Sequence, residues 1–130
     1  MSVRPILTGV DLVDINRLMR MIEDSGPEFI QSAWTTGELH YCKLNPERLA
    51  ARWAAKEATM KALGDGIGTF SPLDIEVHNN NAGTPILQLH GTAGARAEEL
   101  KVVYWSLTLS HEAGFAVAFV VALAGGNNNV

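Results

Sequence analysis

The chain has 130 residues, of which 47% are hydrophobic and 18% are charged. This length is enough for one domain with its own core and too short for two. The formal net charge of −4 argues against a nucleic-acid-binding protein, because such proteins present a basic surface. An acidic partner protein would need a local basic patch instead.

No segment is predicted to anchor or export the protein. The longest apolar run, residues 115–124, falls short of the roughly 18 residues of a membrane span, and the N-terminus lacks signal-peptide anatomy. A single cysteine, Cys42, excludes an internal disulfide and a cysteine zinc site. We therefore expect a cytoplasmic protein with one domain over residues 1–124 and a flexible polar tail at residues 125–130.

The first half of the chain predicts one strand followed by helices. Three of the helices begin at capping signals, which are Asp14, the capping-box spacing between Thr35 and Glu38, and Asn45 followed by proline. The last helix ends before Gly64, a residue typical of the position after a helix. The predicted elements are a strand at residues 6–13 and helices at residues 15–23, 28–33, 46–63 and one starting at the capping box.

The second half is rich in predicted strands. They cover residues 74–78, 85–89, 102–110 and 115–123, with one helix at residues 93–100. Turn residues join the first two strands, and residues 111–114 form a four-residue hairpin loop between the last two. Helices followed by strands indicate an α+β fold, with the helices packed on a mostly antiparallel sheet.

The predicted helix at residues 46–63 is apolar on two sides. With about 100° between successive residues, large side chains and alanines form two opposite faces: Leu49, Trp53, Met60 and Leu63 on one, and Ala51, Ala55, Ala58 and Ala62 on the other. Such a helix is mostly enclosed by protein. Lys56 nevertheless lies within the large apolar face. Glu57 and Lys61 lie on one flank of that face, and Arg48 and Arg52 lie on the other.

Charges on an enclosed helix have two explanations. A buried charge is costly unless it is paired or bound to a ligand, so these residues can mark a functional site. Alternatively, Glu57 and Lys61 form a surface pair one helical turn apart, and Lys56 extends to the solvent. The spacing alone favours neither explanation.

A second unexpected charge, Asp11, interrupts the predicted first strand. It either points outward at the strand's end or lies buried next to a cation. Asp11 and Glu57 are explained together if they share a metal ion. Two carboxylates with a nearby lysine suit Mg²⁺, which takes oxygen ligands and keeps waters or substrate phosphates. The glycine-rich residues 64–68 offer backbone N–H groups to phosphate, although they follow the helix end that disfavours anions.

Several separated segments resemble one known family. They are Gly9 to Leu12 followed by Arg17, the block Arg52-Trp53-Ala54-Ala55-Lys56-Glu57-Ala58, Lys61 to Gly64, and Ser110-His111. In these segments the chain resembles the holo-acyl-carrier-protein synthases, the small bacterial type of 4′-phosphopantetheinyl transferase, and the resemblance extends over residues 6–122. It implies an α+β fold, a homotrimer with coenzyme A bound at the subunit interfaces, and a role in fatty-acid biosynthesis or related lipid metabolism.

The resemblance also implies a reaction. A serine hydroxyl of an apo acyl carrier protein attacks the β-phosphate of coenzyme A, phosphopantetheine is transferred, and adenosine 3′,5′-bisphosphate leaves. Mg²⁺ would be held by Asp11, Glu57 and the coenzyme A pyrophosphate. Glu57 is the expected base, directly or through a metal-bound water, and Lys61 would offset developing charge. The residues expected to contact coenzyme A are Arg52, Lys56, Lys61, Gly64, Gly66, Ser110 and His111.

A docking surface for the carrier follows from the same resemblance, which implies a carrier that is acidic around the modified serine. Arg17, Arg20 and Met21 are spaced i, i+3 and i+4 on the first predicted helix and share a face. This face would supply the local basic patch that the negative net charge requires. An ordinary solvated helix face is the alternative.

Two other functions fit the same residues. A metal-dependent hydrolase of nucleotide or coenzyme A phosphoanhydrides could use two carboxylates and a lysine. Release of adenosine bisphosphate without any carrier protein would favour it. A non-catalytic binding module of the same fold would keep its partner binding after Glu57→Gln and would have no activity to lose.

Overall fold

The computed structural model describes residues 5–64 and 69–125. Its elements, in chain order, are β1 (Ile6–Asp14), α1 (Ile15–Ser25), α2 (Pro27–Ala33), α3 (Thr36–Cys42), α4 (Pro46–Leu63), the 3₁₀ helix η1 (Pro72–Asp74), β2 (Ile75–Asn79), β3 (Pro85–Leu89), α5 (Gly91–Glu99), β4 (Tyr104–Glu112) and β5 (Phe115–Leu123). None of the helices in these ranges combines the length and apolarity that a membrane crossing requires.

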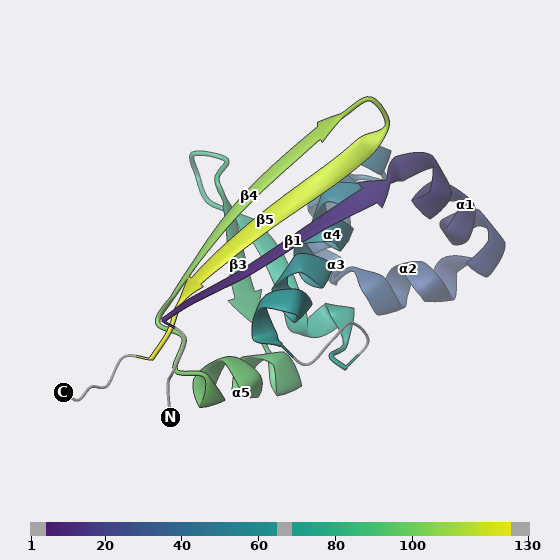
Figure 1. Cartoon of the computed structure of the whole chain (residues 1–130). Coiled ribbons are helices and arrows are strands. Elements are labelled where there is room, and N and C mark those ends of the chain that lie inside the picture. Colours follow the sequence, from purple (N-terminus) through teal and green to yellow (C-terminus); the bar gives the residue numbers. More distant parts are fainter. Residues whose placement is uncertain (1–4, 65–68, 126–130) are drawn as a thin grey trace.

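The strands form two antiparallel sheets around α4. The larger sheet has the order β1-β5-β4, and β2 pairs with β3 in the smaller one. Figure 1 shows the three long strands side by side with α4 behind them, α1 and α2 beyond one end of the large sheet, and α5 near the other. The α+β class is confirmed, and the strands divide between two sheets where the sequence predicted one mostly antiparallel sheet.

Local capping signals position the helices as predicted. Asn45 caps α4 by accepting a hydrogen bond from the Arg48 backbone N–H at 2.9 Å, and Thr35 and Glu38 form the complete capping box of α3. Helix α4 has the predicted bounds and ends at Gly64, whose φ of 86° suits glycine. Asn45 and Gly64 fix the two ends of α4, which carries four of the candidate residues: Arg52, Lys56, Glu57 and Lys61.

Small residues bring α4 very close to the large sheet. Ala54, Ala55 and Ala58 of α4 are fully buried, as are the alanines of central strand β5. A Cβ atom at Gly9 of β1 would lie 1.8 Å from the backbone oxygen of Ala58. The predicted alanine face therefore allows the close backbone approach expected of it, and glycine is required at the point of contact.

The opposite face of the large sheet is apolar and exposed. Along β1 and β5, buried residues alternate with exposed ones, as a strand period of two predicts. The exposed apolar residues that belong to this sheet are Ile6, Val10, Leu12, Tyr104, Phe115, Phe119 and Leu123. No element in the described part of the chain covers this surface, which we call the outer face.

The last hairpin is tighter than predicted. Strand β4 continues to Glu112, and only Ala113 and Gly114 remain in the turn, with φ angles of 54° and 85°. Two residues with positive φ are the geometry of a tight hairpin turn. The predicted four-residue loop is wrong because only Gly114 has the residue type expected at positive φ, and His111 consequently lies in β4, paired with Ala116.

Candidate active site

Two carboxylates from distant parts of the chain meet between β1 and α4. Asp11 lies on the inner face of β1, its side chain 11% exposed, so the outward orientation is wrong. Glu57 approaches from α4. One turn further along α4, the Lys61 ammonium donates to the Val10 carbonyl at 2.8 Å and to Asp11 Oδ1 at 3.2 Å. The structure thus brings together all three residues predicted to be catalytic.

The environment of this pair disfavours two negative charges. Burial, followed by the neighbouring Asp11, raises the pKa of Glu57 to about 7, although Lys61 acts in the opposite direction. Asp11 Oδ2 is buried and has no hydrogen-bond partner. An unpartnered carboxylate oxygen beside a second carboxylate is the arrangement that a bound cation would complete.

The donor set fits a hard cation that keeps other ligands. Within residues 5–64 and 69–125, no group of three or more His, Cys, Asp or Glu side chains could hold a metal. An ion at Asp11 and Glu57 would therefore take further oxygen ligands from water or substrate. Mg²⁺ is bound in this way at phosphate-transfer sites, by one or two carboxylates plus substrate phosphates.

One cavity opens beside Glu57. It has a volume of about 280 Å³ and is lined by Leu12, Val13, Asp14, Arg17, Leu18, Met21, Trp53 and Glu57. Arg17 and Met21 of α1, two of the predicted docking residues, therefore face the carboxylate site. Arg20 is exposed on the same helix but does not line the cavity.

A second cavity of about 280 Å³ lies at the other end of α4. Its lining residues are Tyr41, Glu47, Arg48, Ala51, Arg52, Asn79, Gly83, Pro85, Thr108, Leu109, Ser110 and His111. We call it the Arg52 cavity. It contains three residues that the sequence assigned to coenzyme A, namely Arg52, Ser110 and His111. They come from α4 and β4.

The Arg52 guanidinium has a hydrogen-bond donor without a partner. It is 3% exposed, and its Nε atom is buried without a partner. One terminal nitrogen donates to Asn79 Oδ1, and the guanidinium carbon lies 4.4 Å from the centre of the Tyr41 ring. His111 Nδ1 lies 3.4 Å from Glu47 Oε2. A buried guanidinium with a vacant donor beside a second arginine, Arg48, is suited to bind a phosphate group.

Comparison with known proteins assigns the chain to a family. The family model of the 4′-phosphopantetheinyl transferase superfamily matches residues 8–120. The chain belongs to this superfamily. A holo-[acyl-carrier-protein] synthase of Herpetosiphon aurantiacus is 44% identical over 125 residues, which cover 91% of this chain and 98% of that protein.

Solved structures of similar proteins agree with the assignment. The holo-[acyl-carrier-protein] synthase of Helicobacter pylori in complex with coenzyme A has a TM-score of 0.81 and 31% identity, covering 89% of this chain and 99% of that one. The holo-(acyl-carrier-protein) synthase of Bacillus anthracis in complex with CoA (3′,5′-ADP) has a TM-score of 0.74 and 35% identity, covering 92% and 96%. The likeness therefore extends over almost the whole transferase chain.

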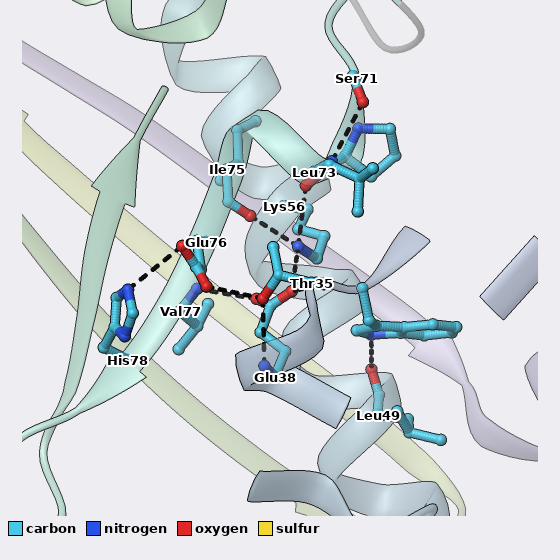
Figure 2. Close-up of polar contacts among 12 residues, drawn as sticks. Thr35, Glu38, Leu49, Lys56, Ser71, Leu73, Ile75, Glu76, Val77 and His78 are labelled. Carbon is cyan, nitrogen blue, oxygen red and sulfur yellow. Dashed lines mark hydrogen bonds and ion pairs between the residues drawn. The ribbon is translucent and has the colours of Figure 1, made fainter. Parts of the chain in front are cut away.

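Lys56 of this transferase lies in neither cavity. It is fully buried, and its ammonium donates to Glu38 Oε1 at 2.7 Å and to the carbonyls of Pro72 and Ile75 at 2.9 and 2.7 Å (Figure 2). Burial lowers the Lys56 pKa, and the Glu38 carboxylate opposes this effect. Lys56 does not extend to the solvent, and with three acceptors around it no contact with coenzyme A is open to it.

The glycines after α4 have no demonstrated role in binding. The Gly64 N–H donates to the carbonyls of Met60 and Lys61, so this amide already serves to close the helix. Gly66 lies outside the residues that the structure describes.

Sequence reasoning missed several residues of the Arg52 cavity. Tyr41 and Glu47 were assigned no role, and Asn79 was treated as turn material. Each lies in the cavity because the fold brings it next to residues distant in the sequence. Asn79, for example, contacts Arg52, which is 27 positions away. No local sequence pattern pointed to Tyr41, whose ring meets Arg52 from 11 positions away.

Proposed function

We propose that this chain transfers the 4′-phosphopantetheine group of coenzyme A to a serine hydroxyl of an apo acyl carrier protein, releasing adenosine 3′,5′-bisphosphate. The observation that carries the proposal is the half-buried Asp11–Glu57 pair, with an unpartnered oxygen and Lys61 beside it. Membership of the superfamily and the likeness to synthases in complex with coenzyme A support it.

We propose that Asp11 and Glu57 hold Mg²⁺ together with the pyrophosphate of coenzyme A. When bound, the ion would neutralise charge on the phosphate oxygens. The two carboxylates then repel each other less, which removes one cause of the raised pKa of Glu57. Lys61 adds a second positive charge at the same place.

The remaining chemistry belongs to the side chains around the acceptor. The serine oxygen forms a bond to the β-phosphorus, and the bond from that phosphorus to the bridging oxygen breaks. Glu57, which lines the cavity beside α1, would accept the serine proton. Lys61 stabilises the negative charge that develops on the bridging oxygen of the departing bisphosphate.

Arg52 and Glu57 are five positions apart on α4 and lie on opposite flanks of the helix, about 140° apart around its axis. Coenzyme A would contact the Arg52 cavity of one subunit and the carboxylate site of a neighbouring subunit, as expected for active sites at the subunit interfaces. We assign the adenosine phosphate end to the Arg52 cavity and the pyrophosphate to Asp11, Glu57 and Lys61. The exposed Ser110 and His111 complete the phosphate end from β4.

We propose α1 as the docking surface for the carrier. Arg17 and Met21 line the cavity beside Glu57, and Arg20 lies exposed on the same helix. Arg17→Glu should raise KM for the carrier about tenfold or more while changing kcat little, because it replaces attraction to an acidic partner by repulsion. An unchanged KM would place the docking surface elsewhere.

We propose a homotrimer, assembled through the outer face. This face exposes aromatic and β-branched side chains on all three strands of one sheet. Contiguous apolar patches of this kind are uncommon on monomers and mark association surfaces. We further propose that residues 1–124 act as one transferase domain in the cytoplasm, with which a free, buried Cys42 is compatible.

The decisive experiment measures the intact mass of an apo acyl carrier protein incubated with the enzyme, coenzyme A and Mg²⁺. A gain of one phosphopantetheinyl group is expected, and Asp11→Ala and Glu57→Ala should abolish it. Carrier proteins from fatty-acid and polyketide systems should be compared. No gain with any of them would refute the proposal, and adenosine bisphosphate released without a carrier would indicate a hydrolase.

A further inference from the structure

A buried ion pair joins three elements without taking part in the proposed chemistry. Lys56 of α4 and Glu38 of α3 lie 2.7 Å apart, and both side chains are 0% exposed. Lys56 also donates to the Ile75 carbonyl, and the Val77 N–H of β2 donates to Glu38 Oε2 at 2.8 Å. Figure 2 shows the Lys56 ammonium and the Glu38 carboxylate facing each other against β2.

Both carboxylate oxygens of Glu38 accept hydrogen bonds from these neighbours. Its Oε1 accepts from Lys56 and from the Thr35 N–H at 2.9 Å, and its Oε2 accepts from Val77. The Thr35 hydroxyl donates in turn to Glu76 of β2 at 2.7 Å. The pair therefore fixes α3, α4 and β2 relative to one another, which a contact between apolar side chains would do with less directional precision.

The same three elements also supply Arg52 and the residues around it, each a few positions away from the ion pair or its partner. We call these surroundings the wall around Arg52. Arg52 precedes Lys56 by one helical turn on α4, and Tyr41 follows Glu38 by nearly one turn on α3. Asn79 follows Val77 by two residues on β2, so it lies on the same face of that strand. Tyr41 stacks on the Arg52 guanidinium, and Asn79 accepts from it.

We propose that Lys56 and Glu38 are positioning residues that hold Arg52 in the geometry for binding the 3′-phosphate of coenzyme A. The inference rests on the proposed function, because it assigns that phosphate to the Arg52 cavity. The pair acts through Tyr41 and Asn79, whose distances to Arg52 depend on how α3 and β2 sit on α4. The carboxylate site is held separately, by the contact of α4 with β1.

The test uses the double variant Glu38→Gln/Lys56→Met, which removes both charges and keeps the side-chain volumes. Replacing a whole buried pair leaves no unpaired charge, so this variant is expected to fold, whereas Lys56→Met alone would leave the Glu38 carboxylate unpaired. The single variant Glu38→Gln keeps the Lys56 donors but leaves the buried ammonium without a counter-charge, so it is measured beside the double variant as the less stable form of the same change. Circular dichroism and thermal melting confirm the fold of each.

The readout is the ratio of two dissociation constants, for adenosine 5′-monophosphate and for adenosine 3′,5′-bisphosphate, measured by calorimetry with EDTA present. This ratio reports the contribution of the 3′-phosphate alone. Arg52→Gln should lower it about tenfold, since it removes a charge-assisted bond to phosphate. Both positioning variants should also lower this ratio, and the double variant should lower it nearly as much as Arg52→Gln does. In both variants KM for coenzyme A should rise while kcat changes little.

A destabilised control separates positioning from loss of stability. Leu63→Ala creates a cavity at the far end of α4 and lowers the melting temperature without touching this wall, so its ratio should equal that of the wild type. If the positioning variants also keep the wild-type ratio while Arg52→Gln lowers it, the inference is wrong and the proposed function stands. If Arg52→Gln keeps the ratio as well, the phosphate assignment fails, and the inference fails with it.

Discussion

Glu57 lies where a carboxylate is unfavourable unless a cation accompanies it. Its pKa is raised from 4.5 to about 7 by burial and by Asp11. Between these two pH values the folded, metal-free protein holds a proton that the unfolded chain has released. Because the folded state binds more protons in this interval, the free energy of unfolding falls as the pH rises through it.

We therefore expect metal-free wild-type protein to lose about 1–2 kcal/mol of stability between about pH 5 and pH 8, a figure reduced from the full shift because Glu57 is partly exposed. Glu57→Gln cannot titrate and should lose less. Urea unfolding of both proteins in EDTA at the two pH values measures the difference. Equal losses in the two proteins would mean that Glu57 does not titrate near neutral pH.

Two unexpected charged residues, Lys56 and Asp11, show how much the sequence predicts about a single position. Lys56 and Asp11 both interrupt apolar patterns, and both are indeed largely buried. Their partners could not be inferred from local spacing, since Glu38 lies 18 positions from Lys56 and Lys61 lies 50 positions from Asp11. The pattern left open whether each charge was buried, and only the fold decided this and supplied the contacts.

The contact between β1 and α4 sets the spacing of the two carboxylates. Gly9 is two residues before Asp11, and Ala58 directly follows Glu57, so this close backbone approach lies beside the proposed metal-ligand pair. Gly9→Ala would place a methyl group against the Ala58 backbone oxygen. Strand and helix would have to separate.

We expect Gly9→Ala to destabilise the fold by about 3 kcal/mol, lowering the melting temperature by roughly 10 °C. The protein that stays folded should bind Mg²⁺ more weakly. Gly37→Ala, the same substitution at an exposed position of α3, is the matched control and should melt within about 2 °C of wild type, because its Cβ would meet no atom closer than 3.4 Å. Similar melting temperatures for the two variants would contradict the close approach.

Helix ends and the pairing of β4 with β5 were predictable because their signals are local, and strand partners that lie far apart in the sequence were not. Asn45, Thr35 and Glu38 each act within three residues of their own position, so α3 and α4 begin where the sequence indicates. Strand pairing depends on contacts between distant segments. The division into two sheets therefore could not be foreseen, and neither could the turn at Ala113, a residue type that rarely adopts positive φ.

At the scale of the whole molecule, we propose that the outer face controls assembly. Phe119, 44% exposed at the middle of central strand β5, lies at the centre of this face. We expect wild-type protein to sediment as a trimer and Phe119→Arg as a monomer with greatly reduced transferase activity, because burying an unpaired charge in an apolar interface is costly. Gln88→Arg on β3 adds the same charge elsewhere and should stay trimeric. A monomeric wild type would refute the role of this face.

Alternate residues of strand β1 face opposite sides of the large sheet. Val10 and Leu12 are 52% and 64% exposed on the outer face, and Asp11 between them turns inward toward Glu57. Lys61 donates to the Val10 carbonyl as well as to Asp11. In the proposed trimer, a neighbouring subunit that contacts β1 would lie one residue away from the proposed metal ligand. Dilution of the protein should therefore weaken Mg²⁺ binding as well as assembly, so that the affinity for the ion depends on enzyme concentration.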